Sequence, residues 1–93
     1  MAFTVHVPGP LRDLSAGKAR VALEGSPRTA GEALALLFAA HPGLKDRVVD
    51  ETGELRPHVN VFVGEESIRH LGGMATGVGE SAEIFILPAL SGG

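Results

Sequence analysis

Residues 29–43 read TAGEALALLFAAHPG, and this stretch decides the fold. Thr29 is a good N-cap, and Glu32 three residues later completes a capping box, so a helix begins here. Pro42 and Gly43 end it. Positions spaced i, i+3, i+4 and i+7 give the helix one buried stripe, made by Ala30, Ala33, Leu34, Leu37, Phe38 and His41.

Two short strands are expected before this helix. Phe3, Val5 and Val7 alternate with polar residues, which is the pattern of a half-buried strand, and residues 8–10 (Pro-Gly-Pro) end it. Residues 11–17 are expected to form a loop or turn. Val21 and Leu23 mark a second strand, closed by Gly-Ser-Pro. We expect the two strands to pair as a hairpin.

Further strands are expected after the helix. A short helical turn over residues 44–49 and a polar loop lead to an alternating strand, VNVFV at 59–63. A turn and a brief strand at Ile68-Arg69 follow, then a glycine-rich stretch, and a last strand over 82–87 that Pro88 ends.

This order predicts an α+β fold of the β-grasp (ubiquitin-like) type. Because a single helix connects two pairs of strands, we expect a mixed four- to five-stranded sheet packed on one main helix. Residues 1–88 should form one domain, and residues 89–93 an exposed tail that ends in Gly92-Gly93.

Composition excludes several classes of function. Lysine and arginine number 8 against 11 acidic residues, for a net charge of −3, so the chain offers no basic stripe for nucleic acid. No apolar run has the length of a membrane helix and no signal peptide opens the chain, so a cytoplasmic location is expected. The chain has no cysteine, which excludes disulfides, thiolate metal sites and a cysteine nucleophile.

Other candidate binding motifs do not fit the spacing or the secondary structure that their chemistry requires. Residues 77–82 (GVGESA) fit a dinucleotide-binding pattern, but a strand follows them where that motif needs a helix. The four histidines, His6, His41, His58 and His70, lack metal-ligand spacing, and the acidic pairs lie in expected turns. We therefore expect no bound metal or cofactor.

The terminal carboxylate of Gly93 is the group that we expect to have a chemical role. A carboxylate is inert until it is activated, and adenylation by ATP gives a mixed anhydride from which sulfide or a persulfide can displace AMP. Without a cysteine, sulfur carried by this chain would have to sit on this terminus. Glycine suits the task because a residue without Cβ passes through a narrow channel.

Three segments carry a resemblance to a known family: ILPALSGG at 86–93, VNVFV at 59–63 and LGGMAT at 71–76. With the β-grasp order, they make the chain similar to the ThiS/MoaD family of ubiquitin-like sulfur carriers, and within it to the carriers that serve cysteine synthesis from O-phosphoserine. The chain departs from the family at two turns, residues 64–66 and 78–81.

The resemblance implies a protein cosubstrate rather than an enzyme. Gly93 would be adenylated and converted to a thiocarboxylate, while Leu90, Ser91 and Gly92 thread the partner's active site. The implied partners are an E1-like adenylyltransferase, which uses ATP, and a sulfur-accepting enzyme such as a cysteine synthase or the large subunit of a molybdopterin synthase.

A candidate docking patch follows from strand alternation. If Val59, Val61 and Val63 face the helix, Phe62 faces away, and Phe85 and Leu87 of the last strand do the same. We expect these three to form an apolar partner-docking patch on the open sheet face, the alternative being that loops cover them. In the family the chain resembles, the activating enzyme holds this face and the tail.

Two functions remain open at this point. One is a sulfur carrier, and the other is a ubiquitin-like modifier joined through Gly93 to lysines of other proteins, since both use the same adenylate. A purely structural β-grasp domain leaves the bare terminus unexplained. For a carrier, cysteine synthesis is favoured by resemblance, with molybdopterin, thiamine and tRNA thiolation as alternatives.

Overall fold

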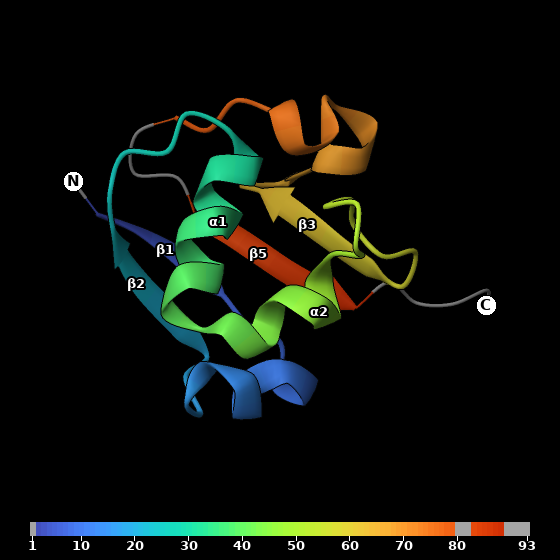
Figure 1. Cartoon of the computed structure of the whole chain (residues 1–93). Coiled ribbons are helices and arrows are strands. Elements are labelled where there is room, and N and C mark those ends of the chain that lie inside the picture. Colours follow the sequence, from blue (N-terminus) through green and yellow to red (C-terminus); the bar gives the residue numbers. More distant parts are fainter. Residues whose placement is uncertain (1, 80–82, 89–93) are drawn as a thin grey trace.

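The sheet has the strand order β2-β1-β5-β3-β4, with one long helix across a face of it (Figure 1). A computed structural model describes residues 2–79 and 83–88. The strands are β1 (Ala2–His6), β2 (Arg20–Glu24), β3 (Val59–Val63), β4 (Glu66–Ser67) and β5 (Glu83–Pro88). The helices are α1 (Ala30–Ala40) and α2 (Lys45–Val48), with short 3-10 helices η1 (Gly9–Ser15), η2 (Pro42–Leu44), η3 (Ile68–His70) and η4 (Gly73–Ala75).

Strand directions make the sheet mixed. β1 and β2 form the expected antiparallel hairpin, and β3 pairs antiparallel with both β4 and β5. The last strand, β5, lies at the centre of the sheet and runs parallel to β1. The predicted β-grasp class, a mixed sheet packed on one main helix, is therefore confirmed.

The capping of α1 follows the sequence prediction with one difference. The Glu32 backbone N–H donates to Thr29 Oγ1 at 3.1 Å. The Glu32 carboxylate reaches back to the N–H of Arg28, at 3.0 Å, one residue before the N-cap. Both bonds satisfy donors that a helix start would otherwise leave free.

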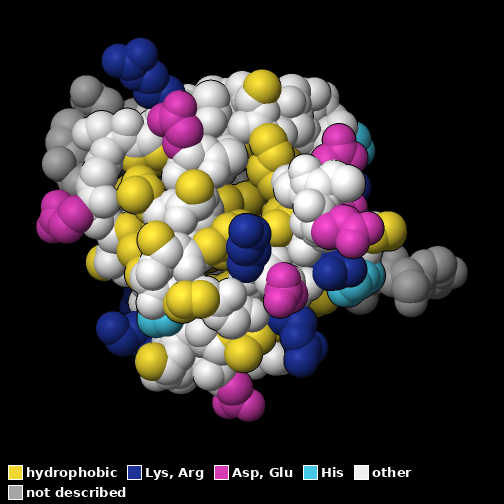
Figure 2. Space-filling model, viewed as in Figure 1, with side chains coloured by type: hydrophobic (Ala, Val, Ile, Leu, Met, Phe, Trp, Pro, Cys, Tyr) yellow, Lys and Arg dark blue, Asp and Glu magenta, His cyan; other side chains and the backbone are white. Residues whose placement is uncertain are grey.

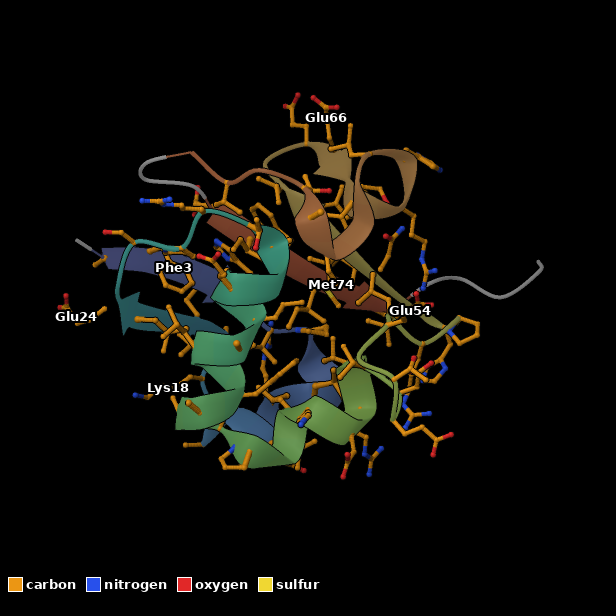
Figure 3. All side chains as sticks on the ribbon, turned by 45° about the horizontal axis from the view of Figure 1, so that its top comes forward. Phe3, Lys18, Glu24, Glu54, Glu66 and Met74 are labelled. Carbon is orange, nitrogen blue, oxygen red and sulfur yellow. The ribbon has the colours of Figure 1, made fainter. Side chains whose placement is uncertain are left out.

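The core lies between α1 and the sheet. Phe3 points from β1 into this layer (Figure 3). Phe38 and His41, which the stripe also includes, are only half-buried at its margin. The fully buried large side chains come from both layers and from the segments that cross between them: Val5, Val7, Leu34, Leu37, Leu44, Val48, Val61, Ile68, Ile84 and Ile86.

The glycine-rich stretch packs against the start of α1. A Cβ on Gly31 would lie 3.2 Å from the backbone oxygen of Met74, so glycine permits this close approach. The Ala30 N–H donates to the Thr76 carbonyl at 2.9 Å, and the Val78 N–H donates to the Arg28 carbonyl at 2.9 Å. These bonds fix the segment that leads to β5.

Three local expectations are corrected. Residues 11–17, expected as a loop or turn, belong mostly to the 3-10 helix Gly9–Ser15. Proline has a helical φ, which suits Pro10 to the start of this helix, and Ala16 in the left-handed region (φ 57°) ends it. Ile68-Arg69 is not a strand: Glu66–Ser67 pairs with β3, and Ser67 Oγ then caps η3 by accepting from the Arg69 N–H. β5 continues through Pro88, which pairs with Val59 as the last residue of the strand.

Among the described residues, no helix has both the length and the apolar character that a membrane span requires.

Candidate functional site

The predicted reacting group belongs to a segment outside the described residues. Leu90, Ser91, Gly92 and Gly93 follow Pro88 in the sequence, and their placement in the fold stays a prediction. What the structure describes is the strand that carries them. β5 lies between β1 and β3: β1 pairs with its first residues, up to Phe85, and β3 pairs with it through Pro88.

The candidate docking patch, Phe62, Phe85 and Leu87, lies on the sheet face opposite α1. Their neighbours Val61, Ile84 and Ile86 are fully buried on the helix side, which fixes the direction of the patch residues by alternation. Phe62 and Phe85 are register partners in the β3–β5 ladder, so the structure brings them side by side. Leu87 stands two residues further along β5, opposite Asn60.

Exposure differs within the patch. Leu87 is 42% exposed, as the prediction of a solvent-facing residue requires. Phe62 and Phe85 are half-buried. The role of the three residues in docking stays a prediction.

His6 partly covers the patch, and sequence reasoning missed this contact. Its ring stacks on Phe85 with ring centroids 4.1 Å apart and an interplanar angle of 11°. Its Nε2 lies 2.7 Å from Glu83 Oε1, so the two polar residues flank the aromatic ring. Alternation places His6 on the open face, but the contact depends on the parallel pairing of β1 with β5, for which one sequence carries no local signal.

The β3–β4 edge of the open face is fixed by a small polar network. Asn60 Oδ1 accepts from Ser67 Oγ at 2.7 Å and from the Val61 N–H at 3.0 Å. Ser67 is buried, and each of these groups has a partner. The network is structural, since it holds the two strands together beside Phe62.

The described part of the chain contains no candidate metal centre. It contains no group of three or more metal-ligating side chains close enough to hold an ion. Within the same residues, no buried side-chain nitrogen or oxygen lacks a hydrogen-bond partner.

Comparison with known proteins identifies the family. The model of the ThiS family matches residues 5–93, which includes the Gly-Gly end. The chain is a member of the ThiS family. This ThiS-family chain is similar to the sulfur carrier protein CysO of Mycobacterium tuberculosis, with 35% identity over 95 residues that cover all of both chains.

Solved structures agree with this assignment. The crystal structure of a BexX/CysO complex from Amycolatopsis orientalis matches with a TM-score of 0.85 and 34% identity, over 98% of this ThiS-family chain and 99% of that chain. Small archaeal modifier protein 1 from Haloferax volcanii matches with a TM-score of 0.80 and 29% identity over the whole of both chains. The chain is thus similar both to proteins named as sulfur carriers and to a protein named as a modifier.

Proposed function

We propose that this ThiS-family chain is a sulfur carrier whose C-terminal carboxylate, on Gly93, is converted to a thiocarboxylate. The observation that carries the proposal is the family match that runs through Gly93, together with full-length identity of 35% to a protein named as a sulfur carrier. The position of β5 supports it, because the ladder with β3 continues through Pro88 and so fixes the last described residue before the tail in the sheet.

The proposed chemistry takes place in two steps. A carboxylate oxygen of Gly93 attacks the α-phosphate of ATP, the bond to the β-phosphate breaks, and pyrophosphate leaves. Hydrosulfide then attacks the carbonyl carbon and expels AMP, so that one oxygen is replaced by sulfur. An enzyme persulfide can give the same product. Its outer sulfur attacks the carbonyl carbon, expels AMP and forms an acyl disulfide with the carrier. A second thiol then attacks the enzyme's sulfur in that bond, which forms an enzyme disulfide and releases the carrier as its thiocarboxylate.

In this proposal the carrier is a cosubstrate, and its partners supply the catalysis. An E1-like adenylyltransferase binds ATP and activates the tail. A sulfur-accepting enzyme, a cysteine synthase by resemblance or a molybdopterin-synthase large subunit as the alternative, then takes the sulfur. The existence of a crystallised BexX/CysO complex supports a carrier of this fold that assembles with another protein.

Removal of the last two residues tests the proposal. A chain lacking Gly92 and Gly93 should keep its fold and melting temperature, because the described sheet and core end at Pro88. It should lose all ATP–pyrophosphate exchange with the E1-like enzyme of the same organism, while the full chain supports it. Exchange by the truncated chain at the full-length rate would refute the proposal.

A second function, conjugation to lysines of other proteins, is favoured by one observation. Small archaeal modifier protein 1 from Haloferax volcanii is 40% identical over 74 residues, covering 80% of this chain. Intact-mass measurement of the chain isolated from its native cells separates the two functions. A carrier shows exchange of one oxygen for sulfur, whereas a modifier is recovered joined to a second polypeptide.

A further inference from the structure

Two grooves flank the end of β5, where residues 89–93 continue from Pro88. The first, of about 330 Å³, lies on the β1–β2 side and is lined by His6, Arg12 and Arg20. The second, of about 150 Å³, is lined by Pro10, Leu11, Arg47, His58 and Pro88. Pro8, Ile86 and Leu87 line both.

Among the residues that the structure describes, every ionisable side chain that lines either groove is an arginine or a histidine. This is notable in a chain whose net charge is −3, with 11 acidic residues against 8 lysines and arginines. Asp13 and Asp46 precede or follow groove arginines in the sequence, but they are exposed and line neither groove. The two grooves therefore bring Arg12, Arg20 and Arg47 to the end of β5.

Strand register shows where the opposite charge lies. Glu24 pairs with Ala2 and Glu83 with Thr4, at the start of β1 and β5. Glu66 lies beside Val63, which pairs with Ile84 at the same end. Arg20 pairs with His6 at the other end, where β1 finishes. The acidic strand residues thus lie toward the start of β5, and Arg20 lies toward the end that Pro88 occupies. The separation is incomplete, because His6, which pairs with Arg20, contacts Glu83 Oε1 at 2.7 Å.

The helix side of the molecule differs from the grooves. Charged side chains of both signs are scattered over it, with hydrophobic ones between them (Figure 2). A mixed surface of this kind is usual for a soluble domain, whereas separated charge favours one orientation of approach by a charged partner.

One of the groove arginines is held in place. Arg12 Nε donates to the Val7 carbonyl at 3.1 Å. The carbonyl of Arg12 accepts from Ser15 Oγ at 3.2 Å, and Ser15, which is fully buried, also donates to the Lys18 carbonyl at 2.8 Å. Because the side chain is already ordered, less conformational entropy is lost when a carboxylate binds it.

We propose that Arg12, Arg20, Arg47 and His58, which we call the basic collar, dock onto carboxylates that surround the entrance of the channel in the adenylating enzyme. The proposal rests on the proposed function and names the surface chemistry of its partner. Leu87 belongs both to the collar grooves and to the apolar patch, so the collar would form the charged rim of one interface with Phe62 and Phe85 at its centre.

A protein surface fits the collar better than a free phosphate does. Arg12 and Arg20 line one groove and Arg47 and His58 the other, so these side chains do not converge on one point. A channel entrance that encloses the tail meets both grooves at once. The chemistry of such an entrance, an acidic rim around an apolar contact, is the complement of this end of the carrier.

Charge reversal at exposed collar residues tests the proposal. Arg20→Glu and Arg47→Glu are made singly and together, because neither side chain is tied to the fold as Arg12 is. Arg28→Glu is the matched control: it makes the same charge change at an exposed residue before α1 that lines neither groove. ATP–pyrophosphate exchange by the organism's E1-like enzyme is measured against carrier concentration at low and high ionic strength.

The double variant should raise the KM for the carrier on the order of tenfold at low salt, with the loss shrinking as salt is added. The wild-type KM should itself rise with salt, and Arg28→Glu should behave as wild type. Circular dichroism checks that each variant is folded. The salt dependence of the wild-type KM is a second test, and it does not depend on the folding of any variant.

The outcomes separate the two proposals. A wild-type chain that is not adenylated at any concentration would overturn the proposed function and the collar with it. Normal wild-type adenylation with equal KM values for the double variant and Arg28→Glu would overturn the collar alone. Titration of the isolated chain with inorganic pyrophosphate, followed by NMR, should leave collar amides unshifted, and saturable shifts confined to them would instead show a small-anion site.

Discussion

The imidazole ring of His6 lies nearly parallel to the phenyl ring of Phe85, with ring centroids 4.1 Å apart. The parallel pairing of β1 with β5 sets these residues opposite each other, and His6 Nε2 also contacts Glu83 Oε1 at 2.7 Å. One histidine therefore covers part of an aromatic ring at the centre of the open sheet face and connects the first strand to the last.

Replacement of this histidine should weaken the β1–β5 contact. His6→Ala removes the stack and a partly exposed hydrogen bond, and we expect unfolding free energy to fall by about 1 kcal/mol. His6→Phe keeps the stack and should lose less. Urea denaturation measures both, with Thr4→Ala, on the same strand and face, as the control. Equal losses for His6→Ala and Thr4→Ala would show that the stack does not stabilise the fold.

An aspartate in place of Phe62 should weaken docking without unfolding the domain. Phe62 is half-buried on the open face and its register partner is Phe85, so Phe62→Asp should leave the core intact while it weakens binding to the adenylating enzyme by about 2 kcal/mol or more. Ala22→Asp places the same charge on an exposed residue of the edge strand β2 and should bind normally.

Calorimetric titration and a circular-dichroism spectrum of each variant check this prediction. Unchanged affinity for Phe62→Asp would remove the residue from the interface. An unfolded variant would mean that Phe62 contributes to the core rather than to a surface.

Asp50 should make stability depend on pH. Its Oδ1 accepts from Thr52 Oγ1 at 2.5 Å, from the Thr52 N–H at 2.8 Å and from the Glu54 N–H at 3.2 Å. These bonds, the one from the Thr52 hydroxyl most of all, hold the pKa of Asp50 below its ordinary value of 3.8. The stabilisation is thus complete above that value and is lost as the pH falls through the folded-state pKa.

Asp50→Asn should therefore be less stable than wild type at neutral pH, and the difference should shrink once the pH is below 3.8. Urea midpoints measured across this range give the result. Glu51→Gln, a change at the adjacent exposed carboxylate, is the control for removal of a nearby charge. If the stability difference between Asp50→Asn and the wild type did not change with pH, these hydrogen bonds would not depend on the charge of Asp50.

Local features of this fold could be predicted from the sequence because short-range interactions determine them. The cap at Thr29, the buried stripe of α1 and the alternation of Val59–Val63 each depend on residues within a few positions. Together with the order of elements they were sufficient for the β-grasp class. The brief strand was misplaced at Ile68-Arg69 because Ile68 is apolar, although it is buried in a 3-10 helix.

Contacts between distant segments could not be predicted in the same way. The His6–Phe85 stack requires knowledge that β5 inserts beside β1, and one sequence does not specify the neighbours of a strand. The basic collar could not be predicted for the same reason. Its four residues come from four separate segments: η1, β2, α2 and the segment before β3. Such sites become visible only when the topology is known.

The terminal residue offers the sharpest test of the proposed chemistry. Gly93→Ala should retain the fold, because the sheet and core that the structure describes extend only to Pro88. Activation should nonetheless be much slower, because the added methyl lies next to the reacting carboxylate and crowds a narrow channel. A displacement of about 1 Å at a reacting centre can cost on the order of a hundredfold in rate.

A chain extended by one residue after Gly93 should react more slowly still, since the carboxylate then lies beyond the position at which the enzyme holds the α-phosphate. Pyrophosphate release with the E1-like enzyme compares the wild type, Gly93→Ala and the extended chain, and Gly79→Ala serves as a control because a Cβ there meets nothing within 4 Å. The control should match the wild type. Equal rates for all four chains would mean that Gly93 is not the reacting residue, and the chain would then be a binding module without thiocarboxylate chemistry.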